Sequence, residues 1–318
     1  MRSLYDPIQG EMLRVEEVLK TVGAVNSHPI GQVLGHILKV RGKRLRPALT
    51  LLTGRFHDYN PELLVSMAVA VELLHTATLV HDDTLDNSAV RRGVPTANCL
   101  WSGGVAVLAG DYLFARSAEF VASTGDLRVI RLFAAVLATI CNGELEQNLN
   151  AYNPEPDRQR YFRMIGNKTA SLFSVASESG ALLSQAPARA VEALRDYGYN
   201  LGMAFQIVDD ILDFFGDAGE MGKPVGSDLI QGTLTLPAIL LMEQYGVDNP
   251  ARAYLRSRHE ADLKRAIEMI RNSSIIQESR DIAAGFCLKA RTSLECLPPI
   301  PSRRCLLDLL DYVMDRTS

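Results

Sequence analysis

Apolar residues recur at intervals of three and four along most of the chain, and this helical period constrains the fold more than any other feature. One such stripe consists of Leu63, Met67, Val71 and Leu74. The alternation of apolar and polar residues that is typical of half-buried strands forms no convincing pattern. Segments rich in Gly, Pro and Asn interrupt the helical period, for example at residues 297–301. The sequence therefore predicts an all-α fold.

The length and composition are those of an ordered globular protein. Of the 318 residues, 47% are hydrophobic and 22% are charged, values that argue against an intrinsically disordered chain. No Gly/Pro/Ser-rich linker and no low-complexity tract divides the sequence, so we predict one domain over residues 1–318. The 33 basic and 37 acidic residues give a net charge of -4, which argues against a nucleic-acid-binding protein.

The five cysteines are scattered and form no C-x-x-C pair, so neither a structural zinc site nor a disulfide framework is expected. Charged residues such as Glu11, Arg14 and Glu16 interrupt the N-terminal segment, which excludes the apolar stretch of a secretory signal. No uncharged apolar stretch reaches about 18 residues, so no transmembrane segment is expected. These features favour a reduced, cytoplasmic protein.

The pattern D-D-x-x-D occurs twice, each time at the end of an apolar helical segment. Its members are Asp82, Asp83 and Asp86 in the first motif, and Asp209, Asp210 and Asp213 in the second. Residues four apart share one face of a helix, so each motif projects carboxylates that repel one another unless a cation binds. Mg2+ typically takes one or two carboxylates, several waters and phosphate oxygens. The duplication therefore predicts a site for Mg2+ and a diphosphate.

Two other interpretations of the acidic motifs exist. A single motif of this kind is more often a solvated acidic helix end, but two copies with similar apolar flanks argue against that interpretation. Paired carboxylates also carry out acid–base catalysis on glycosidic bonds, although three acids in each motif exceed what that chemistry needs.

Basic residues precede and follow the acidic motifs. Five cations lie within eight residues at Lys39, Arg41, Lys43, Arg44 and Arg46. Arg91 and Arg92 follow the first motif and are suited to clamp phosphate oxygens. Lys168 lies at the start of a helical segment, where anions are favoured, and Lys223 lies in a loop after the second motif. Alone, each segment would be interpreted as a solvated face or a surface loop.

Together these segments resemble the trans-isoprenyl diphosphate synthases, or polyprenyl synthetases. The matching segments are Gly42–Pro47, Leu74–Thr76, His81–Asp86, Arg91–Gly93, Lys168–Thr169, Phe205–Gln206, Asp209–Asp213 and Gly222–Pro224. The complete set of segments is specific to this family, although no single segment is. It is similar to medium- and long-chain bacterial members of the family.

The resemblance implies a helical bundle of the isoprenoid-synthase type around a central cavity, and a homodimer. It also implies a reaction. An allylic diphosphate bound through Mg2+ loses pyrophosphate, the double bond of isopentenyl diphosphate attacks the resulting carbocation, and a proton is then removed. The aspartates would hold the metal ions, which stabilise the departing pyrophosphate, rather than act as general bases. The product would be destined for a membrane.

The resemblance further assigns roles to individual residues. The metal ligands would be Asp82, Asp83, Asp86, Asp209, Asp210 and Asp213, with Asp82, Asp86 and Asp209 as direct ligands. The isopentenyl diphosphate site would consist of Lys43, Arg46, His75 and Arg92. The allylic diphosphate site would consist of Arg91, Lys168, Thr169, Gln206 and Lys223. Catalysis would depend on Asp82, Asp86, Asp209, Lys168 and Arg91.

The sequence departs from the family pattern at two positions. Arg41 stands where the first glycine of G-G-K-R-L-R-P is usual, with its neighbours intact. Thr233 stands where a lysine is often found before the segment Thr235–Pro237. A cation expected near the allylic diphosphate is therefore absent at Thr233.

Small side chains precede the first acidic motif and predict the product length. The growing hydrocarbon is expected to follow the helix before Asp82, and Ala77 and Thr78 lie about 6 to 8 Å below that residue at 1.5 Å per residue. Short-chain members of the family commonly block this level with an aromatic residue. The tunnel is therefore expected to stay open toward Leu74, which predicts a C30 to C50 product. Alternatively, Ala77 only packs against a neighbouring helix.

Other functions compete with this prediction. A geranylgeranyl or farnesyl diphosphate synthase would share the same motifs. A terpene cyclase needs no isopentenyl diphosphate site, so Lys43, Arg46 and His75 argue against it. A non-catalytic or partner-dependent subunit of a heteromeric synthase is the alternative from another class, although both acidic motifs are complete.

Overall fold

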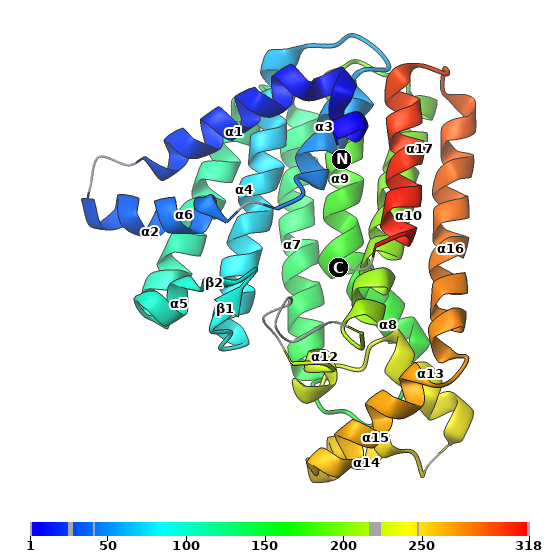
Figure 1. Cartoon of the computed structure of the whole chain (residues 1–318). Coiled ribbons are helices and arrows are strands. Elements are labelled where there is room, and N and C mark those ends of the chain that lie inside the picture. Colours follow the sequence, from blue (N-terminus) through cyan, green and yellow to red (C-terminus); the bar gives the residue numbers. More distant parts are fainter. Residues whose placement is uncertain (1, 25–27, 41, 216–223, 247, 317–318) are drawn as a thin grey trace. The chain divides into compact units, whose positions relative to one another are not determined.

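The computed structural model describes residues 2–24, 28–40, 42–215, 224–246 and 248–316. Its regular structure is almost entirely helical, which confirms the all-α prediction (Figure 1). The exception is a hairpin of β1 (Val90–Arg91) and β2 (Val94–Pro95), in which Val90 pairs with Pro95. Strands of two residues are too short to show an alternating pattern, so the sequence gives no sign of them.

The contacts within the chain divide it into two compact units, each composed of three stretches of sequence. Unit 1 comprises Met1–Val136, Leu172–Gly198 and Ser293–Leu309, and unit 2 comprises Leu137–Ser171, Tyr199–Thr292 and Leu310–Ser318. The boundaries between the stretches fall inside helices, so the two units are not consecutive domains. The single-domain assignment stays a prediction.

Unit 1 contains the N-terminal helices and the hairpin. Its complete elements are the 3-10 helix η1 (Arg2–Ile8), α1 (Gln9–Gly23), α2 (His28–Lys39), α3 (Leu45–Gly54), α4 (Pro61–Leu85), β1, β2, α5 (Ala97–Leu100), α6 (Gly103–Ala122) and the 3-10 helix η3 (Leu294–Cys296). It also takes parts of α7 (Leu127–Leu149), α9 (Ser171–Leu183), α10 (Ala188–Leu212) and α17 (Pro301–Met314).

Helix α4 forms the core of unit 1. It begins after Asn60, whose side chain accepts a hydrogen bond from the backbone N–H of Glu62 and so caps the helix. Residues 64–65 and 67–74 are buried, and α4 packs against α3 and α6 (Figure 1). Glu72 is the acidic residue within this buried run, and a buried carboxylate needs a partner. The first acidic motif lies at the far end of the same helix.

Among the described residues, α4 is the one helix that is long and apolar enough to cross a membrane. However, 67% of its most apolar window is buried inside the fold. Burial of this extent is typical of a core helix, so the hydropathy of α4 is weak evidence for a membrane span. We interpret α4 as a core helix.

Unit 2 contains the second acidic motif. Its complete elements are α8 (Arg158–Ile165), the π-helical turn η2 (Gly166–Ala170), α12 (Ser227–Ile230), α13 (Leu236–Tyr245), α14 (Pro250–Ser257) and α15 (Glu260–Arg271). It also holds α16 (Ile275–Ser293) up to residue 292 and the C-terminal parts of α7, α10 and α17. The end of α10 carries the motif, α8 supplies a side chain that contacts Asp210, and η2 supplies one that contacts Gln206 beside the motif.

Candidate active site

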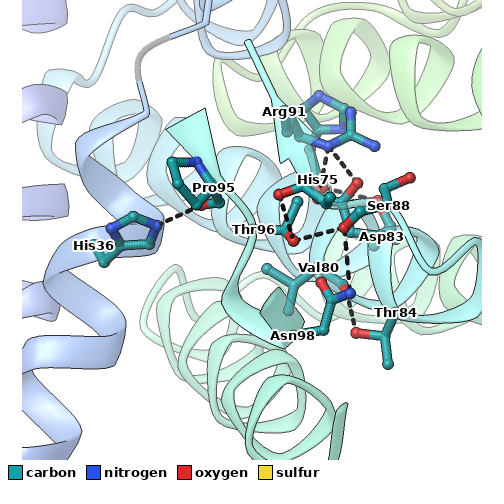
Figure 2. A network of polar contacts seen from close by, with 12 residues as sticks. His36, His75, Val80, Asp83, Thr84, Ser88, Arg91, Pro95, Thr96 and Asn98 are labelled. Atoms are coloured by element: carbon teal, nitrogen blue, oxygen red, sulfur yellow. Dashed lines mark hydrogen bonds and ion pairs between the residues drawn. The ribbon is translucent and has the colours of Figure 1, made fainter. Parts of the chain in front are cut away.

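The first acidic motif lies at the C-terminal end of α4. Asp82 and Asp86 are half-buried and one helical turn apart, so they share a face. Asp83 lies on another face and is buried. The Nε atom of Arg91 lies 2.8 Å from both oxygens of Asp83 (Figure 2). Arg91 therefore neutralises Asp83.

The β1–β2 hairpin holds the two arginines that follow the motif. Its turn needs left-handed backbone at Arg92, with φ of 52°, and at Gly93, with φ of 74°. The side chain of Thr96 donates a hydrogen bond to the carbonyl of Ser88 over 2.6 Å, which closes the loop (Figure 2). The Arg92 guanidinium lies against Gly42, where an added Cβ would be 2.6 Å from Nη1. Gly42 thus leaves the space that Arg92 fills.

A pocket in unit 1 brings these arginines to His75. Its walls include His36, Arg44, Glu72, His75, Thr76, Asp83, Arg91 and Arg92. Burial lowers the pKa of His75 well below its usual value, and the charges of Arg46, Arg92, Arg91 and Arg44 lower it further. His75 is therefore a neutral imidazole within a group of guanidinium cations. Guanidinium cations gathered around a neutral side chain favour an anion, and phosphate suits the planar guanidinium.

The other predicted residues of the isopentenyl diphosphate site lie at the start of α3. Arg46 is buried, with Cζ 4.3 Å from the ring centroid of Phe173. The backbone carbonyl of Lys43 accepts a hydrogen bond of 2.6 Å from the Tyr5 hydroxyl, which fixes this segment. The charges of both Arg46 and Arg92 act on His75, and their grouping around one anion site stays a prediction.

Arg44 has a role that the sequence does not predict. Its Nε lies 2.7 Å from Glu16 of α1 and its Nη1 lies 2.5 Å from Glu72 of α4. Burial alone would lower the pKa of the Arg44 guanidinium, but Glu72 and Glu16 raise it above its usual value. Arg44 therefore ties the basic segment to two helices and is a positioning residue. A lone glutamate in the apolar run of α4 is the sequence signal that points to such a pair.

The residues predicted to set product length lie deeper on α4. Leu74 and Ala77 are fully buried, whereas Thr78 is half-buried. Ala77 shares a face of the helix with His81, which lies so close to α6 that a Cβ at Gly110 would be 2.2 Å from its ring. An enlarged side chain at position 77 would therefore project toward α6.

In the second acidic motif, Asp210 and Asp213 are held by protein donors. Asp210 accepts hydrogen bonds from the Tyr161 hydroxyl (2.6 Å) and from Nε2 of Gln206 (2.8 Å). Burial raises the pKa of Asp210 to about 7, against the opposing effect of these two hydrogen bonds. Asp213 accepts hydrogen bonds of 2.7 Å from the hydroxyl and 3.1 Å from the backbone N–H of Ser227. Both side chains are almost fully buried.

Asp209 differs from its two neighbours. Its side chain is 34% exposed, and its Oδ1 lies 2.7 Å from Nη1 of Arg316. Asp209 is therefore the member of the second motif that is most accessible to a metal ion. Neither Arg316 nor Tyr161 belongs to a sequence motif, so neither was predicted.

Two predicted residues of the allylic diphosphate site, Thr169 and Gln206, connect to this motif. Thr169 donates a hydrogen bond of 2.7 Å to Gln206, which in turn donates to Asp210. Lys168 makes an ion pair of 2.5 Å with Glu144 and a hydrogen bond of 3.2 Å with Gln147. Both Lys168 and Thr169 lie in the π-helical turn η2, a feature common at functional sites.

Two other positions complete the predicted site. Lys223 lies outside the described residues. Thr233 is half-buried and lines a pocket of unit 2 together with Gln147, Tyr161 and other residues. Its hydroxyl brings no charge to that pocket.

The described residues contain no cluster of three or more His, Cys, Asp or Glu side chains arranged to hold a metal ion. A preformed cluster is not required for Mg2+, which keeps several waters and binds through one or two carboxylates together with substrate phosphates. Asp82 and Asp86 in unit 1, and Asp209 in unit 2, supply carboxylates of this kind. The residues present therefore fit a metal ion that arrives with a diphosphate.

Comparison with known proteins identifies the family. The profile of the family described as "Polyprenyl synthetase" matches residues 27–273. The chain belongs to this family. It is 40% identical to a prenyl transferase of Synechocystis sp., over 99% of this chain and 98% of the relative. It is 37% identical to heptaprenyl diphosphate synthase component 2 of Geobacillus stearothermophilus, over 99% of each chain.

The structure resembles that of a family member with bound ligands. The polyprenyl synthase of Caulobacter crescentus, solved in complex with calcium and isoprenyl diphosphate, superimposes with a TM-score of 0.94 at 34% identity. The alignment covers 100% of this chain and 98% of that chain. Family membership makes this chain a transferase of prenyl groups and confirms the isoprenoid-synthase type of fold.

Proposed function

We propose that this chain condenses isopentenyl diphosphate with an allylic diphosphate head to tail to give a C30 to C50 polyprenyl diphosphate. The double bonds that the reaction forms have the trans configuration. The observation that carries this proposal is the group of arginines around the neutral His75, beside the acidic end of the apolar helix α4. This arrangement supports a diphosphate site next to a metal site at the end of α4. The heptaprenyl name of one relative supports a product in this length range.

In this proposal the residues divide the substrates between them. Lys43, Arg46, His75 and Arg92 hold isopentenyl diphosphate. Arg91, Lys168, Thr169, Gln206 and Lys223 hold the allylic diphosphate. Asp82, Asp86 and Asp209 are the direct ligands of Mg2+, and Asp83, Asp210 and Asp213 support them. Bound Mg2+ supplies Lewis-acid stabilisation of the negative charge that develops on the departing pyrophosphate.

We further propose that the chain functions as a cytoplasmic homodimer. Exposed apolar side chains on α6, among them Val105, Val107 and Leu108, favour a protein partner. One relative is named as a component of a synthase, so a different subunit is the alternative partner. All five cysteines are free, which fits a reducing compartment.

A single assay tests the reaction, the product length and the need for a partner. The purified chain is incubated with Mg2+, labelled isopentenyl diphosphate and each allylic starter from C5 to C20, and the products are sized. We expect a ladder that ends between C30 and C50. A product that stops at C20 would support a geranylgeranyl diphosphate synthase. No incorporation with any starter would support a partner-dependent subunit or a cyclase.

We expect Ala77→Phe to shorten the products. Ala77 is fully buried on the face of α4 that carries His81, so a phenyl ring there would block the proposed path of the hydrocarbon. Insertion into a packed region costs about 1–3 kcal/mol, so circular dichroism must confirm that the variant folds. The matched control is Ala261→Phe at an exposed position of α15, which should keep the wild-type product distribution. An unchanged distribution in folded Ala77→Phe would remove this residue from chain-length control.

A further inference from the structure

The side chain of His36 on α2 contacts both the β1–β2 hairpin and the residue that follows α5. Its Nε2 lies 2.8 Å from the backbone carbonyl oxygen of Pro95 in β2 (Figure 2). Its ring lies edge-on to the indole ring of Trp101, with 5.5 Å between the ring centroids. A carbonyl oxygen only accepts hydrogen bonds, so Nε2 of His36 carries the proton and is the donor. His36 thus attaches α2 to the hairpin by a hydrogen bond and to the end of α5 by a ring contact.

The hairpin needs contacts from other elements to hold its position. Each of its strands has two residues, and a two-stranded hairpin by itself is marginally stable at best in water. Pro95 pairs with Val90 at the open end of the hairpin, and Arg92 lies in the turn at the other end. Because the hairpin is so short, a shift of Pro95 moves the turn with it.

The contact between His36 and Pro95 also lies in the wall of the proposed isopentenyl diphosphate pocket. Both residues line this pocket together with His75, Arg91 and Arg92. The side chain of His36 is half-buried there. A residue that holds the hairpin from this wall therefore bears on the position of the arginines in the pocket.

The two arginines of the hairpin differ in how strongly they depend on it. Nε of Arg91 lies 2.8 Å from both carboxylate oxygens of Asp83, so α4 fixes this side chain without help from α2. Arg92 lies in the turn itself, so its backbone moves with the hairpin. Loosening the hairpin should therefore displace Arg92 more than Arg91.

We propose that His36 is a positioning residue for isopentenyl diphosphate. The hydrogen bond from its Nε2 to the Pro95 carbonyl fixes the hairpin relative to α2 and so holds Arg92 in the pocket. His36 acts through Arg92 rather than by binding the diphosphate itself. This inference rests on the proposed function, because that function assigns the pocket to isopentenyl diphosphate.

The test separates the hydrogen bond from the ring contact with two variants of the full chain. His36→Phe keeps an aromatic ring beside Trp101 but loses the donor, whereas His36→Gln loses the ring but can place an amide N–H near the position of Nε2. Isothermal titration calorimetry measures the dissociation constant of isopentenyl diphosphate. We expect this constant to rise about threefold to tenfold in His36→Phe and to stay within about twofold of wild type in His36→Gln.

A third variant keeps the test valid if the phenyl ring disturbs folding. The amide of His36→Asn is one methylene shorter than that of His36→Gln, so it should not reach Pro95 and should weaken isopentenyl diphosphate binding as His36→Phe does. The matched control is His57→Phe, which replaces an exposed histidine in the bend after α3. It should leave the affinity for isopentenyl diphosphate unchanged. Circular dichroism checks that each variant folds.

Steady-state kinetics shows whether the effect is specific to one substrate. In His36→Phe, the KM for isopentenyl diphosphate should rise about threefold to tenfold, because a contact that supports substrate binding is lost. The kcat and the KM for the allylic substrate should each change by less than about twofold, because Arg91 stays tied to Asp83.

A purely structural role of His36 would give a different pattern. The melting temperature of His36→Phe would fall, and the KM values of both substrates would rise together. That pattern, wild-type affinity for isopentenyl diphosphate in folded His36→Phe or His36→Asn, equal weakening in His36→Gln, or no binding by the wild-type chain would each overturn the proposal. The proposed function fails by another result, namely no condensation by the wild-type chain with any starter.

Discussion

Asp82→Ala and Asp209→Ala should each reduce Mg2+-dependent condensation by about a thousandfold or more. Asp82 belongs to the half-buried face of the first motif, and Asp209 is the most exposed carboxylate of the second. Each is proposed to bind Mg2+ directly, so its loss removes charge stabilisation where pyrophosphate departs. The measurement is product formation from labelled isopentenyl diphosphate. It is made at a Mg2+ concentration that saturates the wild-type chain and again at ten times that concentration.

The controls separate a lost ligand from a lost fold. Asp58→Ala removes an exposed acid from the loop between α3 and α4 and should keep full activity. Circular dichroism should show native helix content for all three variants. Asp209→Ala should have the lower melting temperature of the two site variants, because it leaves the buried Arg316 without its ion-pair partner. Substantial turnover by either site variant would contradict the assignment of its aspartate as a direct metal ligand.

Arg44→Met should lower the free energy of unfolding by about 3–5 kcal/mol, the range typical for removing one partner of a buried ion pair. Arg44 and Glu72 are both more than 90% buried, and Glu16 is the second acidic partner. Without the guanidinium, the carboxylate of Glu72 remains inside the apolar core of unit 1. Urea unfolding followed by circular dichroism measures the change.

The chain offers a matched control for Arg44→Met. Arg14→Met breaks an ion pair to Glu62 of the same 2.7 Å length as that between Arg44 and Glu16, but both of its side chains are well exposed. It should change the free energy of unfolding by no more than about 1 kcal/mol. Equal effects of the two substitutions would show that Arg44 does not act through burial of its ion pairs.

Local patterns were sufficient to predict the fold class and a site for Mg2+ and a diphosphate. The helical period of segments such as residues 61–85 depends on residues three and four apart, so a single stretch of sequence reveals it. The acidic motifs are local in the same way. The β1–β2 hairpin was missed because it has two residues in each strand, and the resemblance to a family supplied the substrates.

The roles of individual aspartates, in contrast, depend on residues distant in sequence. Arg91 neutralises Asp83, and Tyr161 together with Gln206 holds Asp210. Within each motif the three aspartates are chemically alike in sequence, and only their neighbours in space distinguish a proposed direct ligand from a proposed supporting residue.

The sequence by itself determined an all-α chain with two acidic motifs and several basic segments, from which we predict metal and phosphate binding, because periodicity and short motifs are properties of adjacent residues. The tertiary structure alone decided that Arg44 is paired with Glu72 and that Arg316 lies on Asp209. The physical reason is that an ion pair depends on distance in space and on burial. Neither quantity can be read from the order of residues along the chain.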